Sequence, residues 1–389
     1  MSAEGKTTPH PALSPEGRGR YEPTPDDWES RAPGDLGMDG DALKAAIAYH
    51  EAHETTWRRD FLTASGRYIG VADEPPAAGD VLGPVLPRGG PSGLVLRGGV
   101  IAAEWGETDR VEMSFSIAKS YLSALAGLAM ARGLIKSLDD RVADHGLDDG
   151  FTSAHNRGIT WRHLLQQTSE WEGTLWDKPD TIDHNRDLGR SELGGAVKGT
   201  RRELRVPGTY WEYNDVRVNR LSLSLLRLFG APLADVLRRD IMDPIGASAA
   251  WRWEPYRNAH VDIGGTRMPS VPGGSHWGGG LWMSTRDHAR FGLLVQRGGR
   301  WGGRAVLPQT WIDALREPCA VNPAYGLLWW LNPSREAVPG APASSFGARG
   351  AGSNVIWLDP EQDLVVVARW VDRPHVAPLL GLIAGSVRK

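Results

Sequence analysis

Apolar residues recur at intervals of three or four positions in several stretches of this chain, and each stretch predicts a helix. The first is DGDALKAAIAYHEAHE, residues 39–54, in which Asp39 stands at a suitable N-cap position. Further helical patterns cover residues 161–167, 220–229, 233–242, 284–299 and, as a short helix, 374–389. Ser284 or Thr285 would cap the helix over 284–299, and Gly298 would end it.

The stretch SFSIAKSYLSALAGL, residues 114–128, predicts a helix that is apolar on nearly every side. Large apolar residues recur in it at helical spacing, and alanine and glycine fill the remaining faces. A helix of this kind lies buried in a core, and Gly133 is its predicted end. Two polar residues, Ser116 and Lys119, stand at its start.

Apolar runs bounded by turn residues predict strands near both ends of the chain. Residues 92–106 form a hairpin around Gly98-Gly99, and residues 325–332, 354–360 and 363–371 form later strands. We therefore expect an α/β (α+β) fold with one antiparallel sheet, built from both chain ends and flanked by terminal helices. Residues 37–134 and 291–389 would form this α/β subdomain and residues 135–290 a mostly helical one, together a single catalytic unit.

Residues 1–36 are rich in proline, glycine and charge, which predicts a flexible tail. They lack the apolar core of a signal peptide, and no later stretch is a membrane-spanning run, so a cytoplasmic protein without a membrane partner is expected. The 44 basic and 47 acidic residues give a net charge of −3, which argues against a nucleic-acid partner. Cys319 is the single cysteine, so an internal disulfide and a thiolate metal cluster are excluded. No cofactor or metal is expected.

The spacing of Ser116 and Lys119 places both side chains on one face of a helix start, where free N–H groups favour negative charge. A lysine desolvated by apolar neighbours loses affinity for its proton. It can then take the proton of a serine, which becomes a nucleophile. Ser-x-x-Lys also occurs by chance, as in SVRK at residues 386–389, so the pair needs supporting residues.

Two further motifs could complete such a site. Tyr213 in PGTYWEYND offers a hydroxyl that relays a proton to a leaving group, and Tyr256 in EPYRNAH is the alternative. The glycine-rich segment FGARGAGSN, residues 346–354, leads into a strand whose N–H groups could face an oxyanion.

In this order, the motifs resemble those of the serine β-lactamase and penicillin-binding-protein superfamily, in its class C-like branch with esterases and nylon-oligomer hydrolases. The resemblance covers roughly residues 37–389 and includes TWRHLLQQTS, GGGLWMSTRDHARFG and WLDPEQDLVVV. It implies a β-lactamase-like fold in which Ser116 is acylated, Lys119 accepts its proton and Tyr213 is the shared acid and base. The backbone N–H groups of Ser116 and Ala351 would form the oxyanion hole.

Two motifs depart from the family pattern, and both bear on the substrate. Asp215 stands where the family commonly has an asparagine, and Ala348-Arg349-Gly350 replaces a motif that begins with lysine or histidine. Arg349 could supply the missing cation or could be a solvated surface residue. Because a lone Asp215 charge would repel an anionic acyl donor, we predict a small neutral ester or amide as substrate. A β-lactamase or D-alanyl peptidase, and a non-catalytic binding protein, are the alternatives; the oligomeric state is unknown.

Several other residues near these motifs are candidates for substrate binding. His276 lies in the glycine-rich segment GGSHWGGG, where a structural histidine is the alternative. Some of the 17 tryptophans would line an aromatic pocket while most pack in the core. The candidates are Asp215, Arg349, Gly350, Trp171, Trp176 and His276, with Trp211, Trp277 and Trp282 nearby.

Overall fold

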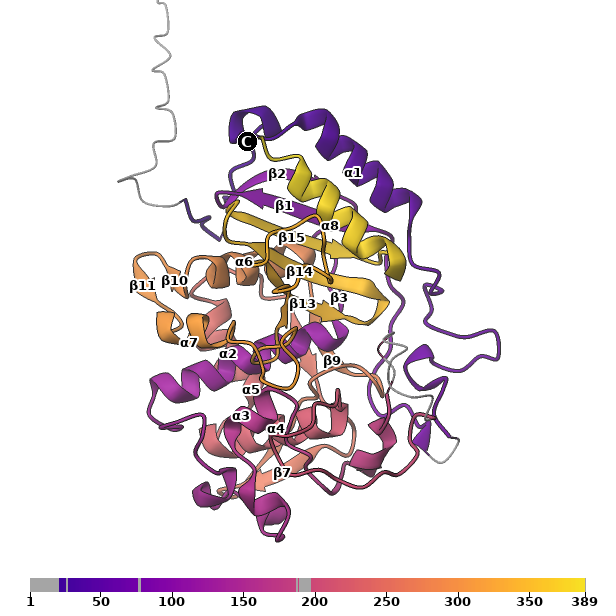
Figure 1. The fold of residues 1–389 in the computed structure, drawn as a ribbon, viewed down its shortest axis with the longest axis vertical. Coiled ribbons are helices and arrows are strands. Elements are labelled where there is room, and N and C mark those ends of the chain that lie inside the picture. Colours follow the sequence, from indigo (N-terminus) through magenta and orange to yellow (C-terminus); the bar gives the residue numbers. More distant parts are fainter. Residues whose placement is uncertain (1–20, 26, 76–77, 187, 189–196, 389) are drawn as a thin grey trace, which may run out of the picture.

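A six-stranded antiparallel sheet forms the frame of the molecule (Figure 1). The computed structural model describes residues 21–25, 27–75, 78–186, 188 and 197–388. The strands run in the order β12-β13-β14-β15-β1-β2, so the last strand pairs with the first, with Ser92 opposite Arg369. Their bounds are β1 Ser92–Arg97, β2 Val100–Trp105, β12 Trp330–Leu331, β13 Phe346–Gly350, β14 Asn354–Asp359 and β15 Leu364–Arg369. The predicted sheet built from both chain ends is confirmed.

Helices cover both faces of this sheet. Helices α1 (Gly40–Ala52) and α8 (Val376–Gly385) lie together along one face, and α6 (Thr285–Gln296) packs on the other (Figure 1). Side chains alternate between the two faces of a strand. On β15, Val366 therefore joins the core under α1 and α8, whereas Val365 joins the core beside α6.

The other large core surrounds α2 (Ala118–Ala131), which is buried on nearly every side as its sequence predicts. The neighbouring helices are α3 Trp161–Leu165, α4 Asp215–Phe229, α5 Leu233–Leu237 with a π-helical turn over Arg238–Met242, and α7 Gln309–Ala314. Helix α2 contacts α4 and α5 directly. No helix in the described part of the chain is long and apolar enough to cross a membrane.

Two features of the middle and late chain differ from the prediction. Of the strand expected over residues 325–332, only β12 forms, because Leu328 has a left-handed φ of 61° and turns the chain. Short strands, which the sequence did not signal, also occur between the helices. These are β3 Glu112–Met113, β4 Thr174–Leu175, β5 Lys178–Pro179, β6 Arg252–Glu254, β7 His260–Ile263, β8 Thr266–Pro269, β9 Gly280–Met283, β10 Arg300–Trp301 and β11 Arg304–Ala305.

The second half of the expected flexible tail packs on the hairpin of β1 and β2. The indole Nε1 of Trp28 donates to the carbonyl oxygen of Gly99 at 2.9 Å, and Ser30 forms a bridge with Ile101. Leu36 is buried against the α1 side of the sheet. The tail prediction is corrected for these residues, while residues 1–20 and 26 lie outside the described residues.

Arg369 joins the large sheet to the small sheet of β3, β9 and β6. Its buried guanidinium donates to the carbonyl oxygen of Met283 at 2.8 Å and to that of Met113 at 2.6 Å. It also donates to the side-chain oxygen of Asn354 at 3.1 Å. Since Met113 lies three residues before Ser116, this contact fixes the start of the Ser-x-x-Lys segment relative to the sheet.

Replacing Arg369 by leucine would leave these three buried acceptors without their donor. An unsatisfied buried polar group costs about 1–3 kcal/mol, so we expect Arg369→Leu to lower the free energy of unfolding by about 3 kcal/mol in urea denaturation. Arg304→Leu, on the exposed strand β11, is the matched control and should change it by less than about 0.5 kcal/mol. Equal losses in the two variants would contradict the role assigned to Arg369.

Candidate active site

Ser116 and Lys119 meet where a short turn passes into α2. Ser116 lies in a 3-10 turn, Phe115–Ile117, and Lys119 lies in the first turn of α2. Phe115 has a φ of 50°, which non-glycine residues rarely adopt, so the chain bends sharply just before the serine. The ammonium Nζ of Lys119 donates to Ser116 Oγ at 3.0 Å. Ser116 is partly exposed, whereas Lys119 is 1% exposed.

Lys119 also contacts a carboxylate that changes its protonation. Its Nζ donates to Asp215 Oδ1 at 2.5 Å and to the carbonyl oxygen of Gly273 at 3.1 Å. Burial by itself lowers the pKa of Lys119, but the Asp215 carboxylate outweighs burial and raises this pKa above its usual value. The expectation that Lys119 loses affinity for its proton is therefore wrong.

Asp215, the first residue of α4, has other polar partners as well. Its Oδ2 accepts from Arg186 Nη1 at 2.6 Å and lies 3.0 Å from the ring Nδ1 of His276. Burial tends to raise the pKa of Asp215, but Lys119 and Arg186 hold it well below its usual range. Asp215 is thus a compensated charge, and the predicted repulsion of anionic substrates by an unpaired Asp215 is corrected. No motif signalled Arg186.

Two more carboxylates, Glu74 and Asp183, contact His276 and Asp215. Glu74 Oε1 lies 2.7 Å from His276 Nε2, and Asp183 Oδ2 accepts from the backbone N–H of Asp215 at 2.8 Å. Lys198 forms ion pairs with Glu74 and, at 3.5 Å, with Asp183. Three carboxylates therefore face three cations, Lys119, Arg186 and Lys198.

The donor types of this cluster include a set that could hold a metal ion. One ligand atom each from Glu74, Asp183 and His276 lie within 4.8 Å of one another. The ammonium of Lys198 already pairs with both of these acids. We therefore assign the set to ion pairing within the protein.

Tyr213 lies beside Lys119 in an aromatic group. Lys119 Nζ is 4.7 Å from the centre of its ring, and the Arg186 guanidinium is 5.4 Å away. Trp330 stacks on Tyr213 with the ring centres 5.8 Å apart. Trp211 and Tyr325 lie 6.2 and 6.4 Å from the same ring. The sequence missed Trp330 and Tyr325, because their segment looked like a regular strand.

The alternative tyrosine, Tyr256, is 1% exposed and has other partners. Its hydroxyl bonds to Asn219, its ring lies edge-on to Trp277, and burial raises its pKa well above the usual value. Asn258, from the same motif, donates to Asp177 at 2.8 Å. Of the two tyrosines, Tyr213 is the one beside the lysine.

Two glycines let the backbone approach the serine closely. A Cβ atom at Gly350, the last residue of β13, would overlap the carbonyl oxygen of Ser114, so only glycine allows β13 to pack against the serine turn. Ala351, which follows, is exposed and carries the second expected oxyanion N–H. A Cβ at Gly274 would lie 3.4 Å from both Ser116 Oγ and Lys119 Nζ. Gly274 belongs to the glycine-rich segment GGSHWGGG, in which the sequence pointed only to His276.

The remaining predicted residues lie in different settings. Trp171 is buried and donates from its indole to the carbonyl oxygen of Gly150 at 2.7 Å. Trp277 and Trp282 belong to the core, and Trp277 stacks on His276 with ring centres 4.0 Å apart. Trp176 is partly exposed. The guanidinium of Arg349 lies 5.9 Å from the ring centre of Trp330, which places it near the aromatic group.

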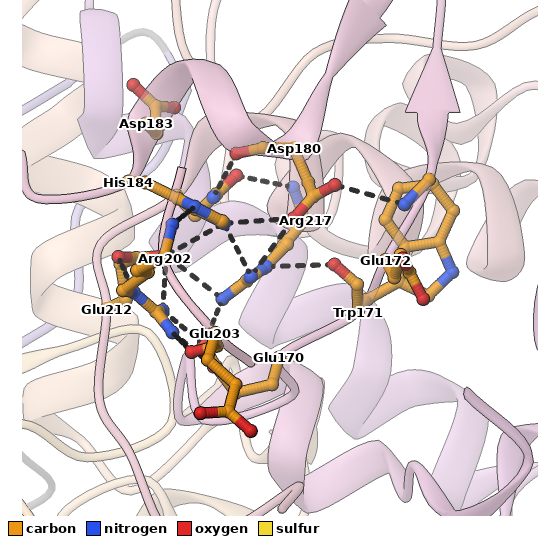
Figure 2. A network of polar contacts seen from close by, with 12 residues as sticks. Glu170, Trp171, Glu172, Asp180, Asp183, His184, Arg202, Glu203, Glu212 and Arg217 are labelled. Carbon is orange, nitrogen blue, oxygen red and sulfur yellow. Dashed lines mark hydrogen bonds and ion pairs between the residues drawn. The ribbon is translucent and has the colours of Figure 1, made fainter. Parts of the chain in front are cut away.

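A buried charge network fixes the start of α4, where Asp215 lies. Arg217 donates to Glu170 at 2.5 Å, to Asp180 at 3.1 Å and to the carbonyl oxygen of Trp171 at 3.0 Å (Figure 2). Asn214 caps α4 by accepting from the Arg217 N–H at 3.1 Å, and its side chain donates to the carbonyl oxygen of Asp180 at 2.8 Å. The network thereby helps to position Tyr213 and Asp215, the two residues that flank Asn214.

Comparisons with known proteins show the family and the fold of this chain. The family model described as Beta-lactamase matches residues 93–375. None of the curated proteins matches the sequence.

Among solved structures, a penicillin-binding-protein homologue from Caulobacter crescentus has 17% sequence identity and a TM-score of 0.57, with 90% of this chain and 99% of its own covered. EstCE1, a hydrolase with promiscuous acyltransferase activity, has 15% identity and a TM-score of 0.56 over 90% and 99% of the chains. A family VIII carboxylesterase has 15% identity and a TM-score of 0.54 over 76% and 92%. At such identities these likenesses establish the fold.

The positions of the two tyrosines predict opposite results for their phenylalanine variants. Tyr213→Phe removes a hydroxyl beside Lys119, and loss of a proton-transfer group typically costs about 10²- to 10⁴-fold in kcat. Tyr256→Phe removes a buried bond to Asn219 and should mainly lower stability, by about 1 kcal/mol. Steady-state kinetics and thermal unfolding of both variants test this ranking, and the reverse ranking would move the acid and base role to Tyr256.

Proposed function

The chain belongs to the beta-lactamase family and is a serine hydrolase of that superfamily, and we propose that it cleaves small uncharged esters or amides through a covalent acyl-enzyme on Ser116. The observation that carries the proposal is the contact of 3.0 Å between Lys119 Nζ and a partly exposed Ser116 Oγ. A serine hydroxyl beside a buried cation and a tyrosine is a suitable nucleophile for acyl transfer.

In the proposed reaction, Ser116 Oγ attacks the substrate carbonyl carbon while Tyr213, which must be ionised for this step, takes the serine proton and becomes a phenol. Tyr213 then gives this proton to the leaving oxygen or nitrogen as its bond to carbon breaks. The backbone N–H groups of Ser116 and Ala351 would stabilise the oxyanion. Water, deprotonated by the same tyrosine, hydrolyses the acyl-enzyme and regenerates Ser116.

Charge pairing supports an uncharged substrate. Lys119, Arg186 and Lys198 are each paired with carboxylates, so none of these three offers a free charge to a substrate carboxylate. The strand β13 carries Arg349 in place of the lysine or histidine that the resemblance led us to expect. The aromatic group of Trp211, Tyr213, Tyr325 and Trp330 offers apolar contacts instead.

The carboxylesterase and the hydrolase EstCE1 among the structural neighbours are consistent with ester cleavage. A β-lactamase or D-alanyl peptidase activity, and a binding protein without turnover, are the alternatives. The cytoplasmic location also stays a proposal.

Ser116→Ala tests the nucleophile. We expect this variant to lose covalent labelling by a fluorophosphonate probe and at least about 10³-fold in the rate of p-nitrophenyl butyrate hydrolysis. Removing one small hydroxyl at a helix start should leave thermal unfolding nearly unchanged, which serves as the control for folding. A labelled Ala variant would show that another residue is the nucleophile, and an unlabelled, inactive wild type would favour the binding protein.

The substrate class is tested by comparing p-nitrophenyl butyrate with nitrocefin, which carries a carboxylate. A hydrogen bond to a charged group contributes about 1.5–3 kcal/mol, so without a dedicated cation we expect kcat/KM for nitrocefin to be lower by about 10- to 100-fold. Arg349→Ala should leave butyrate hydrolysis within about threefold. Efficient nitrocefin hydrolysis that is lost in Arg349→Ala would instead assign Arg349 as the carboxylate-binding cation.

A further inference from the structure

The carboxylate of Asp215 contacts Lys119, and Asp215 stands at a position where the family commonly has an asparagine. A carboxamide is uncharged and leaves the protonation of a neighbouring amine to its other surroundings. A buried carboxylate in contact with the amine favours the ammonium, because losing the proton would leave the carboxylate without its partner in a medium of low dielectric. The contact of 2.5 Å between Asp215 Oδ1 and Lys119 Nζ is of this kind.

We propose that Asp215 is a positioning residue that keeps Lys119 an ammonium throughout the reaction, so that Lys119 is a fixed cation and Tyr213 is the base. This inference rests on the proposed acyl transfer at Ser116. It explains why the lysine has three acceptors around it, Ser116 Oγ, Asp215 Oδ1 and Gly273 O, since an ammonium has three donors.

Asp215 cannot relieve this constraint by taking the proton itself. Arg186 and His276 both contact its second oxygen, Oδ2, and Asp183 accepts from its backbone N–H. The pKa of Asp215 accordingly lies well below its usual range. The carboxylate therefore stays ionised while the lysine beside it stays charged.

The groups that face this pair from the surrounding elements also favour two ionised partners. Glu74 pairs with Lys198 and contacts His276. Asp183 pairs with Lys198 and with Arg186. Tyr213, Tyr256 and Tyr325 are the nearby phenols, and Tyr256 and Tyr325 have a pKa raised well above the usual value by burial. With all three carboxylates ionised, loss of the Lys119 proton would remove one of the three positive charges, those of Lys119, Arg186 and Lys198, that balance them.

In the proposed acylation, Lys119 therefore neither accepts nor releases a proton. As the bond from Ser116 Oγ to the carbonyl carbon forms, the serine proton moves to the side-chain oxygen of Tyr213, which the step requires to be ionised. As the bond from carbon to the leaving group breaks, this proton moves to the leaving atom. Lys119 holds three protons before and after each step and donates one hydrogen bond to Ser116 Oγ.

The test is the pH dependence of kcat/KM for p-nitrophenyl butyrate in wild type and in Asp215→Asn. Asp215 raises the pKa of Lys119, so the charge is fully present below that pKa and is lost as the pH rises through it. The alkaline limb of wild type should therefore lie at high pH, whereas in Asp215→Asn burial dominates and the alkaline limb should move to lower pH. If Lys119 is the base, Asp215→Asn will gain activity at pH 7 and its acid limb will move down, which would overturn the inference.

Two variants serve as matched controls for the activity profile. Asp148→Asn removes a carboxylate that is ion-paired with Arg220 and Arg227 and should leave the profile unchanged. His276→Asn removes a partner of Asp215 but keeps the carboxylate on Lys119, so it can lower kcat without moving the alkaline limb down. A downward shift in either control would contradict a specific role for Asp215.

A readout independent of turnover is the ¹³C NMR titration of the lysine Cε signals, with the Lys119 signal assigned by its loss in Lys119→Met. We expect the wild-type Lys119 signal to titrate above the ordinary lysine range and that of Asp215→Asn to titrate at lower pH than wild type. Titration of wild-type Lys119 below the ordinary lysine value of about 10.4 would overturn the inference even if Asp215→Asn failed to fold. Retained labelling of Ser116→Ala would instead overturn the proposed function, so the two failures are distinguishable.

Discussion

The buried ion pair between Lys119 and Asp215 is the interaction on which the rest of the site depends. It joins the first turn of α2 to the first turn of α4, and without Asp215 the buried Lys119 would be a costly unpaired charge. The pair holds the lysine against Ser116 and brings Tyr213, two residues before Asp215, to the same place. The same ion pair thus holds α2 against α4 and positions the residues proposed to react.

Two sets of contacts hold Lys119 and Asp215 in place, one at the start of α4 and one before α2. On the side of α4, the bonds of Arg217 to Glu170, Asp180 and Trp171 fix the helix start (Figure 2). The Asn214 side chain caps the helix by accepting from the Arg217 N–H. On the side of α2, Arg369 ties the strand before Ser116 to the large sheet, and Gly350 lets β13 approach the serine turn. Both arginines are buried with their donors satisfied, which gives the site a rigid frame.

Charge compensation changes how the substrate is understood. From the sequence, Asp215 and Arg349 are the charges that would decide whether an anionic substrate binds. In the structure, Asp215 belongs to a balanced cluster with Arg186, Lys198 and Lys119, so it presents no lone negative charge. The proposed preference for uncharged substrates rests instead on the pairing of the cations and on the aromatic contacts. Whether an anionic substrate binds then depends on Arg349.

The sequence by itself determined the main helices, the sheet strands β1, β2, β14 and β15, and the spacing of Ser116 and Lys119, because periodic apolar patterns and short-range spacing are local properties. Only the tertiary structure decided the protonation of Lys119, since the partner that controls it lies 96 residues away. Arg186 and Trp330 reach the site for the same reason, from segments without a recognisable motif. A pKa depends on charges and burial in space, and the order of residues along the chain does not specify which distant groups will meet.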